Sequence, residues 1–202
     1  MTRALVAGAV AAMVAMAATP ARAEDYTVGE VRAIARELAT KMNVPLDKQG
    51  DLWTRLDRAL DDPAFFSGRP QVNGVIVYQR GGGGFIVKVQ KARALGRFKA
   101  HPKLAMLQFE QVSYGATVGG GTEYGVALVL GLQDVMFLGG EYSGGTRGGT
   151  MGKASMSVTE VTHKATVGTP AYHKLYLIGT GAGAGADAAG ASIKLQLLNW
   201  MD

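Results

Sequence analysis

Glycine is the residue that most constrains how this chain can fold. The sequence holds 29 glycines among 202 residues, and glycines separate nearly all of the segments that are rich in β-branched and aromatic residues. Glycine is unfavourable inside regular elements, but it permits tight turns, β-bulges and close approach of neighbouring strands. This pattern is typical of a sheet made of many strands with sharp connections. Cysteine is absent, so disulfides and thiolate chemistry are excluded.

The segment before residue 70 has the periodicity of helices. Apolar residues recur there at three- and four-residue spacing, which predicts amphipathic helices. Thr27-Val28-Gly29-Glu30 fits a capping box at the start of the first helix. Pro45 is expected to end this helix, a second helix should follow Asp47, and one further turn is expected from Asp62 to Phe66.

From Gln71 onward the pattern is that of strands. The runs Gly74–Arg80 and Phe85–Lys91 predict a hairpin around the glycines 81–84, and Gln133–Leu138 is ambiguous between a strand and a helical turn. Further strands are expected at Leu104–Glu110, Ser113–Gly119, Tyr124–Leu130, Ala154–Val161, His173–Ile178 and Ser192–Leu197. We therefore predict an α+β fold in a single domain, residues 24–202. Its N-terminal helices (24–68) pack on a strongly curved, barrel-like, mostly antiparallel sheet (71–198).

The first 23 residues have the three parts of a secretory signal peptide. Arg3 gives a positive start, Ala4–Ala18 is apolar, and Ala21-Arg22-Ala23 offers a cleavage site before Glu24. We expect the mature protein to be periplasmic or secreted, with possible membrane association. A retained anchor is the alternative, although the apolar stretch is shorter than the ~20 residues that span a bilayer.

Positive charge is concentrated in one block. The chain carries 21 Lys and Arg against 16 Asp and Glu, yet residues 63–109 contain no acidic residue at all. Each cation near an anionic membrane surface can contribute ~1 kcal/mol. We therefore expect this block to bind the head groups of anionic phospholipid; a solvated loop balanced by the acidic helices is the alternative. The candidate head-group residues are Lys88, Lys91, Arg93, Arg97, Lys99 and Lys103. In the expected compartment nucleic acid is not a partner.

The sequence contains no recognisable catalytic or metal-binding motif. Gly148–Ala154 is one residue too short for a phosphate-binding loop, and no nucleophile elbow or dinucleotide fingerprint occurs. His163 and His173 could meet across neighbouring strands, but no paired histidine motif accompanies them. We expect no enzyme activity, no cofactor and no metal.

The chain resembles the SYLF family of lipid-binding domains, which includes exported bacterial members. The matching parts are the hairpin Asn73–Val89, the stretch Ser113–Leu130 and the segment Leu175–Leu195. The family's Trp-Ser-x-Pro element is missing, and only His101-Pro102 stands nearby. The resemblance implies a twisted, barrel-like sheet with flanking helices that binds phospholipid without catalysis.

The function expected from the sequence is thus an exported, non-enzymatic envelope protein that binds phospholipid. Three alternatives stay open. The first is a small outer-membrane β-barrel, the second an envelope module that binds an unidentified protein or a glycan, and the third a hydrolase that uses a carboxylate pair.

Overall fold

The computed structural model describes residues 25–61, 71–83, 87–114, 121–151, 154–164, 173–179 and 190–202. Side chains are described throughout these segments except at 82–88, 113–121, 146–159 and 190–191. The expected signal peptide, the extra turn at 62–66 and the tip of the glycine hairpin lie outside the described residues.

Two helices come first, and strands follow. The helices are α1 (Val28–Lys41) and α2 (Leu46–Asp61), and a short 3₁₀ helix, η1, spans Val135–Phe137. The strands are β1 (Val72–Gly83), β2 (Val87–Phe98), β3 (His101–Tyr114), β4 (Gly121–Leu130), β5 (Gly140–Met151), β6 (Ala154–His163), β7 (Lys174–Gly179) and β8 (Gly190–Met201). In the described part of the chain, no helix is long and apolar enough to cross a bilayer.

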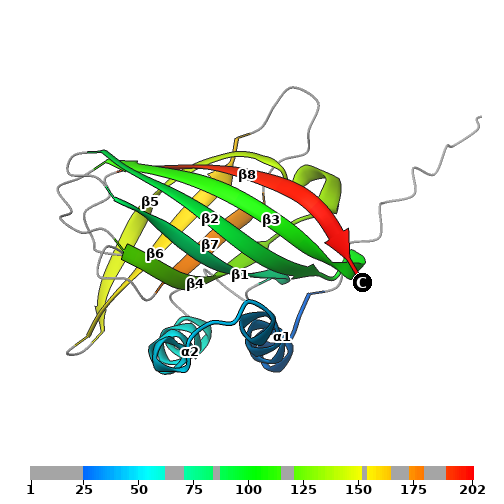
Figure 1. Cartoon of the computed structure of the whole chain (residues 1–202), viewed down its shortest axis with the longest axis horizontal. Helices are drawn as coiled ribbons and strands as arrows, with labels where there is room; N and C mark the ends of the chain where they lie inside the picture. The colour runs from blue at the N-terminus through cyan, green and yellow to red at the C-terminus, as the bar shows by residue number, and fades with distance from the viewer. Residues whose placement is uncertain are drawn as a thin grey trace, which may run out of the picture.

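The strands close into a barrel, with both helices packed against one side of it (Figure 1). Their order around the barrel is β1-β2-β3-β8-β5-β6-β7-β4, and β4 pairs with β1 to complete the circle. Each neighbouring pair of strands is antiparallel. The predicted fold class is therefore confirmed.

The first helix begins where the capping box predicts. The Thr27 hydroxyl accepts from the Glu30 backbone N–H at 3.2 Å, and the Glu30 carboxylate accepts from the Thr27 N–H at 2.7 Å. The Thr27 N–H and the Lys99 ammonium together lower the pKa of Glu30 to about 2. Helix α1 ends at Lys41, so Pro45 stands immediately before α2 and is not the residue that stops α1.

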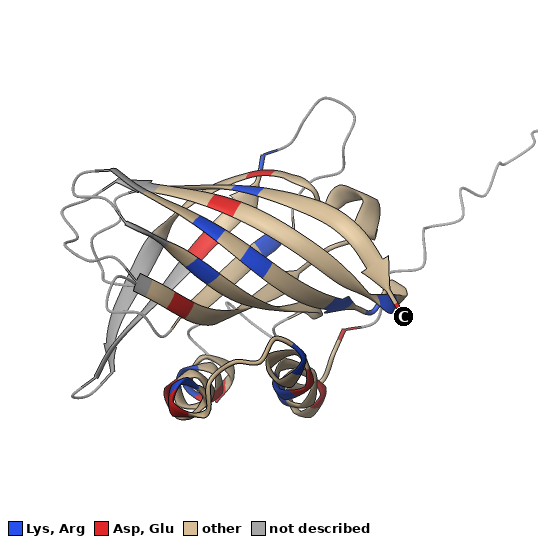
Figure 2. Ribbon diagram, viewed as in Figure 1, with Lys and Arg blue, Asp and Glu red and all other residues tan. Residues whose placement is uncertain are grey.

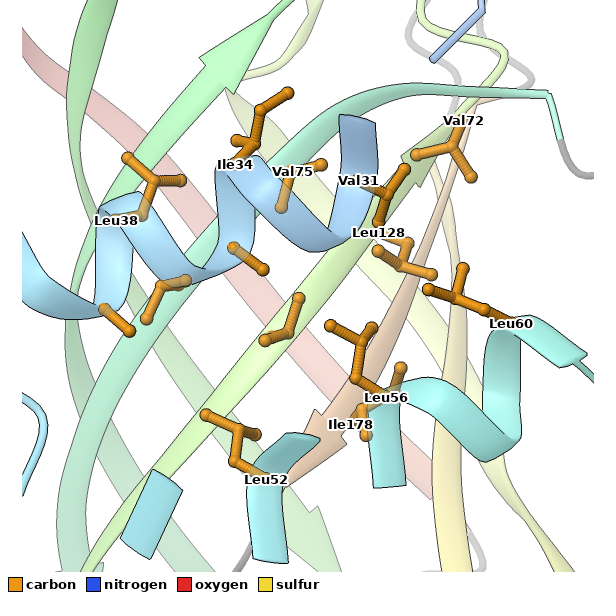
Figure 3. Close-up of a cluster of buried hydrophobic side chains, with 14 of the residues drawn as sticks. Val31, Ile34, Leu38, Leu52, Leu56, Leu60, Val72, Val75, Leu128 and Ile178 are labelled. Atoms are coloured by element: carbon orange, nitrogen blue, oxygen red, sulfur yellow. The ribbon is translucent and has the colours of Figure 1, made fainter. Parts of the chain in front are cut away.

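Two hydrophobic cores lie on opposite faces of β1, β4 and β7. One lies between the helices and the outside of β1, β4 and β7, where Leu38, Leu52 and Leu56 contact the sheet (Figure 3). The other fills the barrel. Strand β1 contributes to both, since Val75 and Val77 face the helices and Ile76 and Tyr78 face the interior. Its near-continuous apolar sequence follows from this burial on two faces.

Three strands differ from the sequence prediction. Strand β3 covers the expected strand Leu104–Glu110 and reaches Tyr114, at the start of the expected strand Ser113–Gly119, whose residues 115–119 lie outside the described part of the chain. Strand β2 continues through the basic block to Phe98. Strand β5 was missed, because its glycines were interpreted as turns. In the structure a Cβ at Gly144 would lie only 2.0 Å from the Glu160 carbonyl oxygen, so close strand contact excludes a side chain there.

Candidate functional site: a cationic groove on the barrel

The six candidate cations lie on strand β2, on its connection to β3 and at the start of β3, so they do not form a loop. Side chains alternate between the two faces of a strand. Ala92 and Ala94 are buried in the barrel interior, whereas Lys91, Arg93 and Arg97 lie on the outer face. The six candidate cations therefore have different surroundings: some form ion pairs with acidic residues, and others line a groove.

Two of the candidate cations hold helix α1 on the barrel. Arg97 Nη2 lies 2.9 Å from Glu37 Oε1, and Lys99 Nζ lies 3.1 Å from Glu30 Oε1. Both carboxylates belong to α1. Part-exposed pairs of this kind contribute at most ~1 kcal/mol each, but they occupy the charges that a head group would need.

Two more candidates contribute nothing to a described site. Lys103 Nζ lies 2.5 Å from Asp202 Oδ1 at an exposed position. Lys88 pairs in register with Ser113, and its side chain lies outside the described residues.

Lys91 and Arg93 do come together, at a groove of about 440 Å³ on the outer face. Arg93 stands between Gln79 on β1 and Gln108 on β3, and both glutamines line the groove. Lys91 stands beside Gly81, which in turn pairs with Thr122 of β4. Each of these residues contributes a hydrogen-bonding side chain except Gly81.

Gly81 explains why the surface is hollow here. It occupies the outward position between Lys91 and Thr122, and a Cβ built on it would meet no atom within 4 Å. The missing side chain leaves open space between a cation and a hydroxyl. Sequence reasoning interpreted this glycine as part of a turn and missed its place on a strand.

The charges around the groove favour an anion inside it. Within the described residues no ion pair involves Lys91 or Arg93, and no acidic side chain lines the groove. The nearest acid in register is Glu110, which stands between Lys91 on β2 and Lys194 on β8. Figure 2 shows this alternation of positive and negative residues across neighbouring strands. Two cations with amide and hydroxyl donors are the groups that bind phosphate or carboxylate.

A buried ion pair lies inside the barrel, and sequence reasoning did not find it. Arg80 donates to Glu123 at 2.9 Å and 2.6 Å, and a further guanidinium nitrogen donates to Gln111. Gly179 makes room for the carboxylate, because a Cβ there would lie 1.8 Å from Glu123 Oε1. The signal was an arginine at an inward position of an otherwise apolar strand. Because its partners are protein groups, we assign it a structural role.

A second polar cluster lies near η1. As the sequence allowed, His163 and His173 meet, and their rings stack with centroids 4.6 Å apart. The Tyr142 hydroxyl donates to the Leu138 carbonyl at 2.5 Å and lies 2.7 Å from His173 Nε2. Burial and the neighbouring His163 lower the pKa of His173 to about 4. Across the described residues no group of three or more His, Cys, Asp or Glu side chains is placed to hold a metal.

Comparison with known proteins gives a fold relationship. No family model matches the chain, and no curated protein matches it. A crystal structure of a beta-barrel-like, uncharacterized protein from Brucella abortus superposes with a TM-score of 0.55 at 21% sequence identity. The match covers 87% of this chain and 96% of that one. The two proteins share the barrel fold.

Proposed function

We propose that this chain is exported and binds anionic phospholipid without catalysis, with the head group held in the groove at Lys91 and Arg93. The observation that carries the proposal is a hollow lined by Gln79, Gln108 and Thr122, beside two cations that form no ion pair within the described residues. A phosphate diester entering there would accept hydrogen bonds from charged and neutral donors together.

The resemblance to SYLF domains supports the same function. It implied a barrel-like sheet with flanking helices, and the chain has that architecture. The head-group site contains fewer residues than the basic block, however. Of the six cations expected from the sequence, we retain Lys91 and Arg93.

A small outer-membrane β-barrel is the second candidate, because eight antiparallel strands in a closed barrel match the smallest members of that class. Its strands carry apolar residues outward, and a Lys or Arg at the bilayer midplane costs ~2–4 kcal/mol. Here the outer row across β2, β3, β8 and β5 places Lys91, Glu110, Lys194 and Glu141 in register. This charged row favours a binding protein over a membrane-embedded barrel.

Charge reversal in the groove tests the proposal. We expect Lys91→Glu/Arg93→Glu to abolish flotation with phosphatidylglycerol vesicles at low salt, because the groove would then repel phosphate. The matched control is Lys48→Glu/Lys164→Glu, which makes the same change in net charge at exposed positions elsewhere. Circular dichroism verifies that each variant is folded. Loss of binding in both variants would indicate a general charge effect with no specific site.

Filling the groove separates shape from charge. Gly81→Gln should weaken vesicle binding at unchanged net charge, because the new side chain occupies the space between Lys91 and Thr122. Gly50→Gln is the control, since a Cβ on this exposed helical glycine also meets no atom within 4 Å. If the wild type does not bind phosphatidylglycerol vesicles at all, the proposed function is wrong.

A further inference from the structure

The outer face of β2, β3 and β8 is organised in rows that run across the strands. One row is charged and contains Lys91, Glu110 and Lys194. The next row, two residues further along each strand, is polar and contains Arg93, Gln108 and Gln196. Successive rows are about 7 Å apart, because a strand rises ~3.4 Å per residue and alternate residues share a face.

The third row is apolar. Leu95 pairs with Met106, and Met106 pairs with Asn199, next to Leu198. Leu198 is 53% exposed and Met106 is 39% exposed, while Leu95 is half-buried against the helix-side core. The row therefore continues the helix-side core from β2 across β3 and β8, where Met106 and Leu198 are exposed.

A β-bulge sets the position of Leu198. The register between β3 and β8 shifts between Met106 and Leu107, so Leu198 is an extra residue between Leu197 and Asn199. Bulges re-aim side chains and interrupt the normal alternation. Here the bulge places two residues of β8, Leu198 and Asn199, opposite the single residue Met106 of β3. As a result Leu198 is exposed beside Met106.

We propose that this apolar row contacts the acyl-chain boundary of a bilayer whose anionic head groups occupy the groove. The β2–β3–β8 face is then the membrane-contact surface, and the inference rests on the proposed function. Single exposed apolar residues are ordinary, but these three are contiguous. They also lie in the row next to that of Arg93, about 7 Å along the strands. Helix α1 reaches β2 through Arg97, but the helices otherwise pack mainly on β1, β4 and β7, and Met106 and Leu198 stay exposed.

The test separates the apolar row from the groove. Met106→Ser/Leu198→Ser should weaken partitioning onto phosphatidylglycerol vesicles about tenfold. It should leave binding of water-soluble glycerophosphoglycerol unchanged, because that head group reaches only the groove. The matched control is Leu46→Ser/Met136→Ser, which removes two more exposed side chains (84% and 80%) away from this face. The control should bind vesicles like the wild type.

A direct readout does not depend on the serine variant being folded. In a background with Trp53→Phe and Trp200→Phe, the fluorescence of Leu198→Trp should be quenched by phosphatidylglycerol with brominated acyl chains, whereas that of Met136→Trp, on the β4–β5 connection, should not. Unchanged vesicle binding by the serine variant, or no quenching at position 198, would overturn the inference and leave the proposed function standing. Head-group binding by the wild type without vesicle binding would also overturn it and would favour a soluble or protein partner. Absence of both kinds of binding would refute the proposed function itself.

Discussion

The stacked histidine pair makes the stability of the fold depend on pH. His173 is only 2% exposed, and its pKa lies at about 4 in the folded chain, below the ordinary histidine value of 6.5. Between these two values the unfolded chain binds more protons than the folded chain. Stability is therefore highest above pH 6.5 and decreases as the pH falls toward 4.

The magnitude follows from the two pKa values. A pKa difference of this size corresponds to about 3 kcal/mol in the acid limit, at ~1.4 kcal/mol per pH unit. Between pH 8 and pH 5, where the folded pKa has not yet been passed, the free energy of unfolding should fall by about 2 kcal/mol. The charged groups on the adjoining strands are already paired, Glu141 with Lys164 at 3.3 Å and Glu160 with Lys174 at 2.7 Å.

Urea unfolding at a series of pH values measures this dependence. His173→Gln should remove most of the decline, because an amide can still donate to the Tyr142 hydroxyl but does not titrate. His101→Gln, which alters a histidine stacked on Trp200 elsewhere in the barrel, should retain the decline. The reasoning would be refuted if wild type and His173→Gln lost the same stability between pH 8 and pH 5.

Two further predictions concern local structure, and urea unfolding at pH 8 tests both. Thr27→Ala should destabilise the chain by ~1 kcal/mol, because the Glu30 backbone N–H loses its side-chain acceptor; an unchanged midpoint would mean that the cap contributes nothing. Glu123→Leu should cost at least about 3 kcal/mol by leaving Arg80 charged and unpaired in the barrel, and adding Arg80→Met should recover much of that loss. A double variant no more stable than the single one would contradict this account of the pair.

Local signals predicted the helices and most strands, whereas long-range pairing determined the site. The capping box at Thr27 could be recognised because its groups lie three residues apart. The contacts of the basic block could not be predicted from the sequence. Only the register of β2 places Arg93 between Gln79 and Gln108 and brings Arg97 to Glu37.

Glycine misled sequence reasoning for a physical reason. The sequence does not distinguish a glycine in a turn from a glycine that permits close contact between strands. For this reason β5 was missed and the groove at Gly81 was not predicted. The pair formed by Arg80 and Glu123 joins residues 43 positions apart. No spacing rule connects them before the pairing of β1 with β4 is known.

The strand order also bears on how the barrel can form. Strand β8 is the last strand in the sequence, yet it lies between β3 and β5 in the barrel. Until it inserts, both neighbours present unpaired edges, which are templates for association with other chains. Closure also requires distant contacts, which slow folding. The vulnerable interval for this protein is therefore the time between synthesis of β3 and the arrival of β8, when a chaperone that shields open sheet edges would be most effective.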